Sequence, residues 1–467
     1  MRKIVLLSFV FSFLTYLTQG QDTNRVFSLK DVYGLVLSNH PVVRQADAVS
    51  SIGSLELMVS RGAFDPQLKS AYDEKTFQGK DYWKVWQTSL RVPVWNGIDV
   101  KADYLQTTGG QLDPMLYTPG NGLTFAGISV PLGQGLLLDA RRAAVKQAGY
   151  MQSMMRAERE AILNKLILQV NNDYLEWSLR YEYTLLLSEA IRLGTERLQN
   201  IRYKVLLGEL PAIDSTEALI ELQNRTVNFL QAQNDFRNAG LVLSNHLWNP
   251  DGDPVQLDTN LIPELFGRNK ISDTIPDFDD LLQTAAQHPD LLQLEAKTGQ
   301  AAIERRWASE KLRPKLNLEY NVLSSGDRPF RSVYDYNTWS GNQKVGINFS
   351  MSLFLREERG KYGIAKLKQS RLEWETDYRR RQLTTELRTA YNELGVIRQQ
   401  CDIQERQVRN TRVLLEGETN RFNEGEGSVF FINNRENALV NSRMKLAEMN
   451  VKYEKSKAKL RWIAGSR

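Results

Sequence analysis

The sequence contains one long internal repeat. His40-Pro41 recurs 248 residues later as His288-Pro289, and in both copies a second proline follows 25 residues after the first, at Pro66 and Pro314. Solenoid repeats have periods of roughly 20–50 residues, so this longer period indicates a duplicated half-molecule. Each half is therefore expected to fold into the same kind of structure.

A second register shows that the two halves differ in length. The segment Arg202–Glu217 matches Arg421–Glu436 at an offset of 219 residues. The first half therefore carries about 29 additional residues, the difference between the two offsets, and they lie between Pro66 and Gly127.

The N-terminus has the pattern of a secretory signal. Arg2-Lys3 precede an apolar run from Ile4 to Leu17, and Thr18-Gln19-Gly20 follow. The run is shorter than the ~20 residues of a spanning helix, so we expect residues 1–20 to be a cleaved signal peptide; the alternative is a membrane anchor. The single cysteine, Cys401, excludes an intrachain disulfide.

Charge and motif content point away from nucleic acid and from catalysis. The formal net charge is +5, and the charged residues, 25% of the chain, are spread along it. The densest basic run, Arg379–Arg381, would fan around a helix as a solvated face. The sequence has no zinc-spaced His/Cys set, phosphate-binding glycine loop or nucleophile motif. We therefore predict no nucleic-acid partner, no cofactor, no metal site and no enzymatic activity.

Each half begins with helical patterns and continues into strands. Short helices at 29–37 and 278–286 end at the His-Pro dipeptides, because proline disfavours a helical conformation in the preceding residue and suits the first turn of the next helix. The two histidines are interpreted as structural. After Pro66 and Pro314 the period changes to two, which predicts strand pairs. The predicted strands are 67–76, 123–132, 315–323 and 343–353.

Aromatic residues gather around these strands. Tyr and Trp at strand ends suit a membrane–water interface, although an ordinary β-sandwich would explain them equally well. They are Tyr72, Phe77, Tyr82, Trp83, Trp86 and Trp95 in the first half, and Tyr320, Tyr334, Tyr336 and Trp339 in the second.

Two very long helices follow, from about 140 to 207 and from about 359 to 424. At 1.5 Å per residue, each would measure roughly 100 Å. In the second, apolar residues from Leu383 to Leu415 recur at alternating intervals of four and three, the heptad pattern of coiled-coil packing. Cys401 lies in this seam and is expected to be a small buried hydrophobe. Each long helix ends at a glycine-bearing turn and returns as a shorter helix, at about 215–247 and 434–463.

This organisation resembles the TolC family of outer-membrane channel proteins over the whole mature chain. Gly208–Ala218 (GELPAIDSTEA) is similar to the family's first hairpin turn, where an aspartate, here Asp214, follows a glycine by six positions. Arg421–Glu436 (RFNEGEGSVFFINNRE) is similar to the second, with Gly427 and Asn433 at the corresponding positions.

The resemblance implies a mainly helical α+β fold. The long coiled-coil hairpins would join an α-barrel in the periplasm, and the strands would join a β-barrel that a homotrimer shares in the outer membrane. Such a channel is the exit duct of a tripartite efflux pump or a type I secretion system. Its partners would be outer-membrane lipid, an inner-membrane transporter and a periplasmic adaptor, which would dock at the hairpin turns around Gly208, Asp214, Gly427 and Asn433.

The expected domain organisation follows the duplication. After the signal peptide, the first repeat covers 21–248, with strands at about 67–132 and a helical hairpin at about 140–247. A linker, corresponding to the family's equatorial belt, covers 249–276. The second repeat covers 277–467, with strands at about 315–353 and a helical hairpin at about 358–464.

The chain departs from the family pattern at two places. Asn433 replaces an aspartate that is frequent in the second turn, which predicts a weaker acidic constriction. The additional segment, about 80–120, alternates like strands and either enters the barrel wall, raising each protomer from four strands to six, or stands above the barrel as an extracellular hairpin. Because the second half is complete without a counterpart, we favour the extracellular hairpin. An alternative reading of the whole chain is a periplasmic coiled-coil adaptor or scaffold without a pore.

Overall fold

The computed structural model describes residues 25–258, 260–266, 277–326 and 341–466. The predicted signal peptide, part of the 249–276 linker, and Tyr334, Tyr336 and Trp339 lie outside these ranges. Within them, no helix combines the length and the apolar character needed to cross a membrane.

The chain forms two compact units, and each combines residues from both repeats. The sheet unit comprises residues 41–168, 274–395 and 456–467, and the hairpin unit comprises residues 1–40, 169–273 and 396–455. Two long helices, α3 (Ala140–Leu206) and α8 (Arg356–Asn423), contribute to both units. Their ends lie within three residues of the ends predicted from the sequence.

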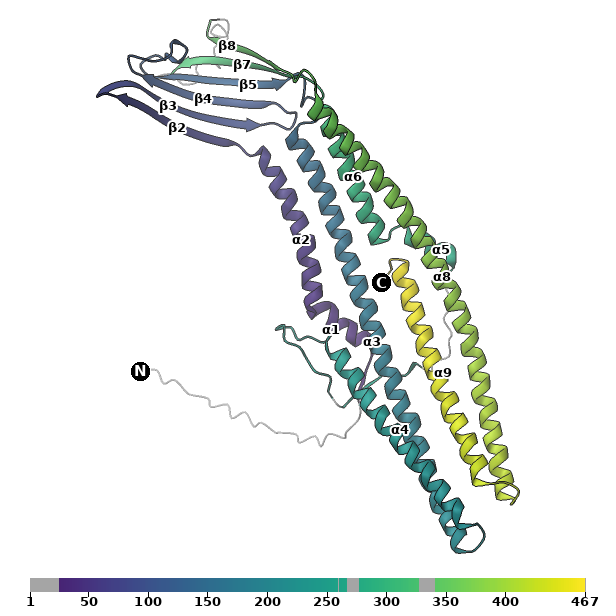
Figure 1. The fold of residues 1–467 in the computed structure, drawn as a ribbon. Helices are drawn as coiled ribbons and strands as arrows, with labels where there is room; N and C mark the ends of the chain where they lie inside the picture. The colour runs from purple at the N-terminus through teal and green to yellow at the C-terminus, as the bar shows by residue number, and fades with distance from the viewer. Residues whose placement is uncertain (1–24, 259, 267–276, 327–340, 467) are drawn as a thin grey trace, which may run out of the picture. The chain divides into compact units, whose positions relative to one another are not determined.

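The sheet unit contains one antiparallel sheet of six strands, in the order β2-β3-β4-β5-β7-β8 (Figure 1). The strands are β2 (Gln67–Phe77), β3 (Lys80–Pro93), β4 (Asp99–Thr108), β5 (Leu123–Pro131), β7 (Lys315–Ser325) and β8 (Gln343–Ser350). The two repeats meet where β5 pairs with β7, with Gly127 opposite Asn321. The 3₁₀ turn η1 (Gly62–Phe64) precedes β2, and η2 (Pro114–Leu116) lies between β4 and β5.

The additional segment of the first repeat is part of this sheet, so the prediction that it forms an extracellular hairpin is wrong. It supplies β3 and β4, which lie between β2 and β5 and are hydrogen-bonded on both sides. The physical reason is that both strands continue the alternation of the sheet. Trp86 opposes Gln106 and lies beside Tyr104, with the two rings 5.6 Å apart, and such cross-strand packing stabilises a sheet interior.

Four helical segments lie side by side next to the sheet (Figure 1). They are α2 (Pro41–Arg61), the N-terminal part of α3, α6 (Pro289–Glu310) and the N-terminal part of α8. Gly53 on α2 lies against Met155 on α3, Gly299 on α6 lies against Tyr150 on α3, and Lys368 on α8 pairs with Glu304 on α6. A shorter helix, α5 (Phe278–Ala285), precedes α6.

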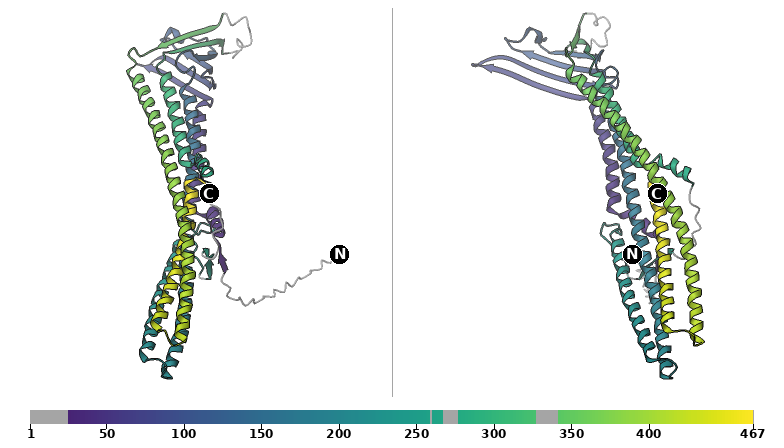
Figure 2. Two further views of the ribbon diagram at one scale, coloured as in Figure 1. Left: turned by 90° about the vertical axis from the view of Figure 1, so that its right-hand side faces the viewer. Right: turned by 45° about the vertical axis from the view of Figure 1, so that its right-hand side comes forward.

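The hairpin unit consists mainly of two helical hairpins that lie side by side (Figure 2). The first joins α3 to α4 (Ala212–Ser244), and the second joins α8 to α9 (Val429–Ile463). Leu175 and Leu179 on α3 pack with Ala447 and Val451 on α9. The unit also contains α1 (Leu29–Asn39) and a small parallel pair of β1 (Arg25–Phe27) with β6 (Leu261–Pro263).

The heptad seam predicted for the second long helix is buried. Leu383, Leu387, Ala390, Leu394, Ile397, Cys401 and Val408 are each at most 9% exposed. Burial raises the pKa of the Cys401 thiol to about 11, with a smaller contribution from Asp402. Cys401 is therefore a packed side chain in its neutral form, as the seam position predicts.

Candidate functional site

The first hairpin turn closes at Gly208. Its φ of +77° lies in the left-handed region, which glycine adopts without the Cβ clash of other residues. The N–H of Gly208 donates to the Val205 carbonyl at 3.0 Å, and that of Glu209 donates to the Lys204 carbonyl at 2.9 Å. This pair of bonds is a Schellman motif that satisfies the last carbonyls of α3.

The second hairpin turn repeats this motif at Gly425, not at Gly427 as the repeat register predicts. Gly425 has a φ of +86°, and the N–H of Glu426 donates to the Arg421 carbonyl at 2.9 Å. Gly427 is required for a different reason. A Cβ at this position would lie 2.9 Å from the backbone nitrogen of Phe422, which is closer than packing permits.

Apolar side chains are exposed around both turns. On the first hairpin they are Tyr203, Leu206, Leu207 and Ile213, and on the second they are Phe430 and Phe431. Asp214 is half-buried in the first turn of α4, and its N–H donates to the Pro211 carbonyl at 3.1 Å. Asn433 is buried. Of the four predicted docking residues, Asn433 thus lies inside the packed helices, whereas Gly208 has open space at its Cβ position.

Behind the turns, a buried cluster of charges joins the two hairpins. Both terminal nitrogens of Arg197 on α3 bond the carboxylate of Glu436 on α9. Nη2 of Arg225 on α4 lies 2.7 Å from Oε2 of the same carboxylate, and Nε of Arg225 donates to Glu221 at 2.8 Å. The Arg225 and Glu436 side chains are 4% and 6% exposed. Asn433 accepts a longer bond from Arg197 at 3.4 Å.

The two arginines determine the ionisation of Glu436. Burial by itself would raise the pKa of this carboxyl, but the hydrogen bonds and charges of Arg197 and Arg225 outweigh it and hold the pKa below its ordinary value. Glu217, the matching residue of the first repeat, behaves oppositely, because burial and the nearby Asp214 carboxylate raise its pKa. The repeat thus places two glutamates at equivalent positions, and only Glu436 is paired with arginines.

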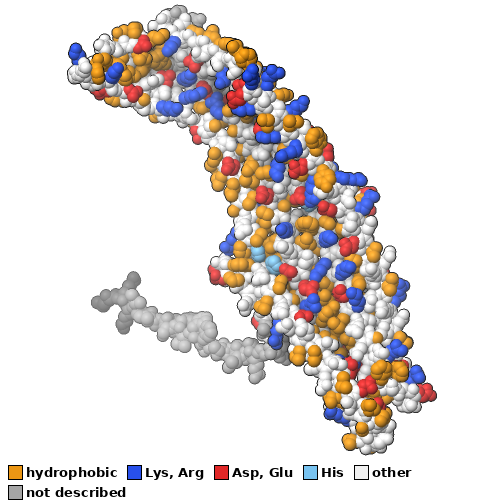
Figure 3. All heavy atoms as spheres, viewed as in Figure 1, with side chains coloured by type: hydrophobic (Ala, Val, Ile, Leu, Met, Phe, Trp, Pro, Cys, Tyr) orange, Lys and Arg blue, Asp and Glu red, His pale blue; other side chains and the backbone are white. Residues whose placement is uncertain are grey.

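The two faces of the sheet differ in chemistry. In an antiparallel pair, directly opposed residues lie on the same face, so the register separates them. One face carries exposed apolar residues, namely Leu68, Tyr72, Trp86, Leu90, Val100, Ile128, Val345, Ile347 and Phe349. The opposite face carries Lys69, Arg91, Lys101, Asp103, Glu319, Asn321 and Lys344. In Figure 3, hydrophobic side chains gather along the upper margin of the sheet, and charged ones of both signs lie on the surface below it.

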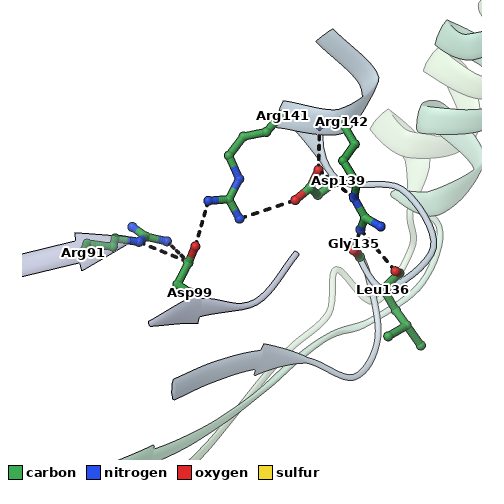
Figure 4. Close-up of polar contacts among 7 residues, drawn as sticks. All are labelled: Arg91, Asp99, Gly135, Leu136, Asp139, Arg141 and Arg142. Atoms are coloured by element: carbon green, nitrogen blue, oxygen red, sulfur yellow. Dashed lines mark hydrogen bonds and ion pairs between the residues drawn. The ribbon is translucent and has the colours of Figure 1, made fainter. Parts of the chain in front are cut away.

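An ion-pair chain links the β3–β4 hairpin to the start of α3 (Figure 4). Asp99 on β4 bonds Arg91 on β3 and accepts from Nη1 of Arg141 at 2.7 Å. Asp139 accepts from the backbone N–H of Arg142 at 2.8 Å and so caps the helix. The Arg142 side chain in turn donates to the carbonyls of Gly135 and Leu136.

These features suit a membrane-embedded sheet with attached helical hairpins, and the comparisons identify the family. Residues 281–466 match the sequence model described as "Outer membrane efflux protein". Residues 281–466 therefore carry the sequence signature of this outer membrane efflux family. This description agrees with the TolC resemblance of the sequence.

Solved channel structures share the fold of this chain at low sequence identity. The CmeC outer membrane channel of Campylobacter jejuni is 15% identical with a TM-score of 0.62, over 99% of this chain and 94% of that one. The open state of the Neisseria gonorrhoeae MtrE outer membrane channel is 15% identical with a TM-score of 0.66, over 94% and 89%. The outer membrane protein VceC of Vibrio cholerae is 14% identical with a TM-score of 0.63, over 94% and 96%. The comparison with curated proteins gave no match.

The arginine partners of Glu436 could not be predicted from the sequence. Glu436 itself stands out, because it recurs with Glu217 at the same place in both repeats. Arg197 and Arg225 come from two other helices and have no common spacing with it, so no sequence pattern could connect them. Among the described residues, no group of three or more His, Cys, Asp or Glu side chains is placed to hold a metal ion.

Proposed function

We propose that three copies of this outer-membrane efflux channel assemble into an exit duct. The duct conducts substrate passively from a periplasmic adaptor and an inner-membrane transporter to the exterior. The observation that carries the proposal is the two-faced sheet, which has an exposed apolar face, a charged face and free edges at β2 and β8. A single sheet of this kind is satisfied when copies close into a barrel with the apolar face toward lipid.

The hairpin turns are the proposed docking points for the adaptor. Exposed apolar residues at both turns, among them Leu207 and Phe430, offer surface that a partner would bury. Gly208, Asp214, Gly427 and Asn433 would shape this surface. In that scheme Asn433 acts by positioning, since its side chain is buried between Arg197 and its own helix.

The two repeats are proposed to be the products of a duplication. Each contains, in the same order, a short helix, a second helix that begins at proline, strands, a long helix and a returning helix. The repeats would thus contribute one hairpin each to the duct, and the additional β3–β4 hairpin would be an insertion into the first repeat.

Membrane extraction and cross-linking test the assembly. We expect the full-length protein, expressed in a bacterium with an outer membrane, to require detergent for extraction and to give a three-copy species with an amine-reactive cross-linker. Recovery of a monomer from the periplasm without detergent would contradict the proposal. That result would favour the alternative of a coiled-coil adaptor or scaffold.

A further inference from the structure

The β3–β4 hairpin is the feature of this chain that its duplicated architecture does not account for. Among the described residues of the second repeat it has no counterpart, and β7 and β8 are directly paired neighbours in the sheet. It enters the sheet between β2 and β5, and its short connection at 94–98 lies at the same end of the strands as the start of α3, where Arg141 reaches Asp99.

The inserted strands continue both faces of the sheet. Leu90 and Val100 extend the exposed apolar face, while Arg91 and Lys101 extend the charged face. A hairpin standing in water above a membrane would have no reason to expose an apolar row in line with that of its neighbours. The pairing register, which aligns this apolar row with the rows of β2 and β5, therefore supports placing β3 and β4 at the same depth as the other four strands.

A side-chain bridge on the charged face ties the insertion to the second repeat. Nζ of Lys101 on β4 lies 2.9 Å from Oε1 of Glu319 on β7, and the bond spans the intervening strand β5. Gly127 lies opposite Lys101 on β5, and a Cβ there would collide with Asn321 and the Tyr320 carbonyl, so β5 and β7 approach closely at this point. Together with the pairing of Asp99 and Arg141, this bridge ties β4 to β7 and to the start of α3.

The two edge strands of the sheet, β2 and β8, run in opposite directions. Five successive antiparallel pairings make β2 and β8 antiparallel to one another. A second copy related by rotation can therefore add its β8 to β2 and keep the antiparallel order, with apolar and charged faces continuous. An odd number of strands would place parallel strands at each junction.

We propose that the inserted hairpin widens the barrel: β2 of each copy pairs with β8 of the next, and three copies close into a wall of eighteen strands lined by the Arg91, Lys101, Asp103 and Glu319 side chains. This inference rests on the proposed trimeric duct. At the usual strand spacing and tilt, eighteen strands give a diameter of roughly 35 Å, against roughly 24 Å for twelve. The bore is therefore about twofold larger in cross-section than four strands per copy would allow, which admits bulkier solutes.

A deletion variant tests the strand number directly. Removing residues 80–121 joins Gly79 to Gly122 and leaves β2 and β5 as a tight hairpin. We expect electron cryo-microscopy of the detergent-purified full chain to count eighteen strands, and that of the variant to count twelve. A twelve-stranded wall in the full chain, with β3 and β4 outside it, overturns the inference but leaves the duct intact. The absence of any closed oligomer would overturn the proposed function itself.

Cysteine accessibility gives a second test that does not depend on the deletion folding. Val100→Cys lies on the apolar face and Lys101→Cys on the charged face of the same strand. The native Cys401 is buried, so a membrane-impermeant maleimide reports on the introduced thiol. In outer membranes we expect Lys101→Cys to react at least tenfold faster than Val100→Cys. Equal rates would place the hairpin in water and reject the wall position.

Cross-linking between copies tests the closure. Tyr72 on β2 and Ile347 on β8 lie on the apolar face at opposite edges of the sheet. Five strand spacings, or roughly 24 Å, separate the two strands in one chain. A disulfide requires Cβ atoms about 4 Å apart, so a bond between cysteines on these strands must join two copies. We expect at least one pairing of cysteines at 68, 70 or 72 with cysteines at 345, 347 or 349 to give covalent oligomers. Monomers from all nine pairings would reject the β2–β8 junction.

Discussion

Arg197 and Glu436 join the two helical hairpins through a bidentate ion pair. Arg197 belongs to α3 in the first repeat and Glu436 to α9 in the second, and Arg225 of α4 completes the cluster from a third helix. Because Glu436 is buried, its charge is compensated by these arginines instead of by water. The carboxylate therefore holds the hairpins of one chain together just behind the proposed docking turns.

Glu436→Gln should loosen this region. The substitution removes the carboxylate charge from Arg197 and leaves the buried Arg225 with Glu221 as its remaining acidic partner. Breaking a buried ion pair costs about 3–5 kcal/mol. Amide hydrogen exchange near 429–440 should accelerate. Glu405→Gln is the matched control, because the Glu405–Arg409 pair is exposed on both sides and such pairs contribute about 1 kcal/mol or less. Equal effects of the two substitutions would show that the buried cluster does not stabilise the hairpins.

Acidification should weaken the ion pairs of Glu436 within a defined pH range. The pKa of Glu436 is lowered in the folded chain, so its contribution to stability is present above the ordinary pKa of about 4.5 and is lost as the pH falls through the lower folded value. Burial lowers the pKa values of His40 and His288. Protonation of these histidines therefore begins to destabilise the fold at a higher pH, as the pH falls below about 6.5. Exchange at 429–440 measured from pH 7 to pH 3 should show a late acidic step, which Glu436→Gln abolishes. Persistence of that step in the variant would assign it to another group.

The two turn glycines should be sensitive to branched residues. Gly208→Val and Gly425→Val each place a β-branched residue at a positive φ, at a cost of about 1–3 kcal/mol. We expect the double variant to retain its oligomer and its sheet but to lose export, measured as substrate accumulation in cells. Gly149→Val is the control, since its Cβ position is open and α3 is helical there. Normal export by the double variant at normal protein levels would argue against docking at the turns.

Periodicity predicted most elements because burial imposes it locally. The alternation after Pro314 and the heptads from Leu383 each reflect a face that must be buried, so the helix and strand assignments follow from the residues themselves. The place of the inserted hairpin could not be predicted in this way. Strand order depends on which edges pair, and Val100 and Lys101 show the same alternation in a wall strand and in a free hairpin.

The sequence predicted only those parts of the site that lie within one short segment of the chain. The glycine-bearing turns are visible in the sequence, but Gly425 and Gly427 stand two residues apart, and only the helix end decides which of them adopts positive φ. The charge cluster depends on three helices that pack together. Glu436 therefore becomes distinctive only once Arg197 and Arg225 are seen beside it.

The single thiol offers a probe of the heptad seam. Burial raises the pKa of Cys401 to about 11, so at pH 8 the thiolate is roughly 100-fold scarcer than in an unfolded chain. Alkylation by iodoacetamide should accordingly be at least about 100-fold slower in the native protein than in denaturant. Comparable rates would mean that the seam opens readily. The measurement needs no substitution, because no other cysteine is present.

Two neighbouring residues of β8 lie on opposite faces of the sheet and can therefore test which face contacts lipid. Ile347 opposes Leu318 on the apolar face and is 69% exposed, while Asn348 opposes Asn317 on the charged face. A lysine on a lipid-facing strand position costs about 2–4 kcal/mol near the membrane centre, whereas one that faces the lumen meets water. Ile347→Lys should therefore reduce the amount of assembled protein in the outer membrane several-fold, and Asn348→Lys should leave it unchanged. Quantifying the heat-resistant oligomer in purified outer membranes distinguishes the two variants. If Asn348→Lys were the more damaging of the pair, the charged face would be the one that contacts lipid, and the proposed orientation of the sheet would be reversed.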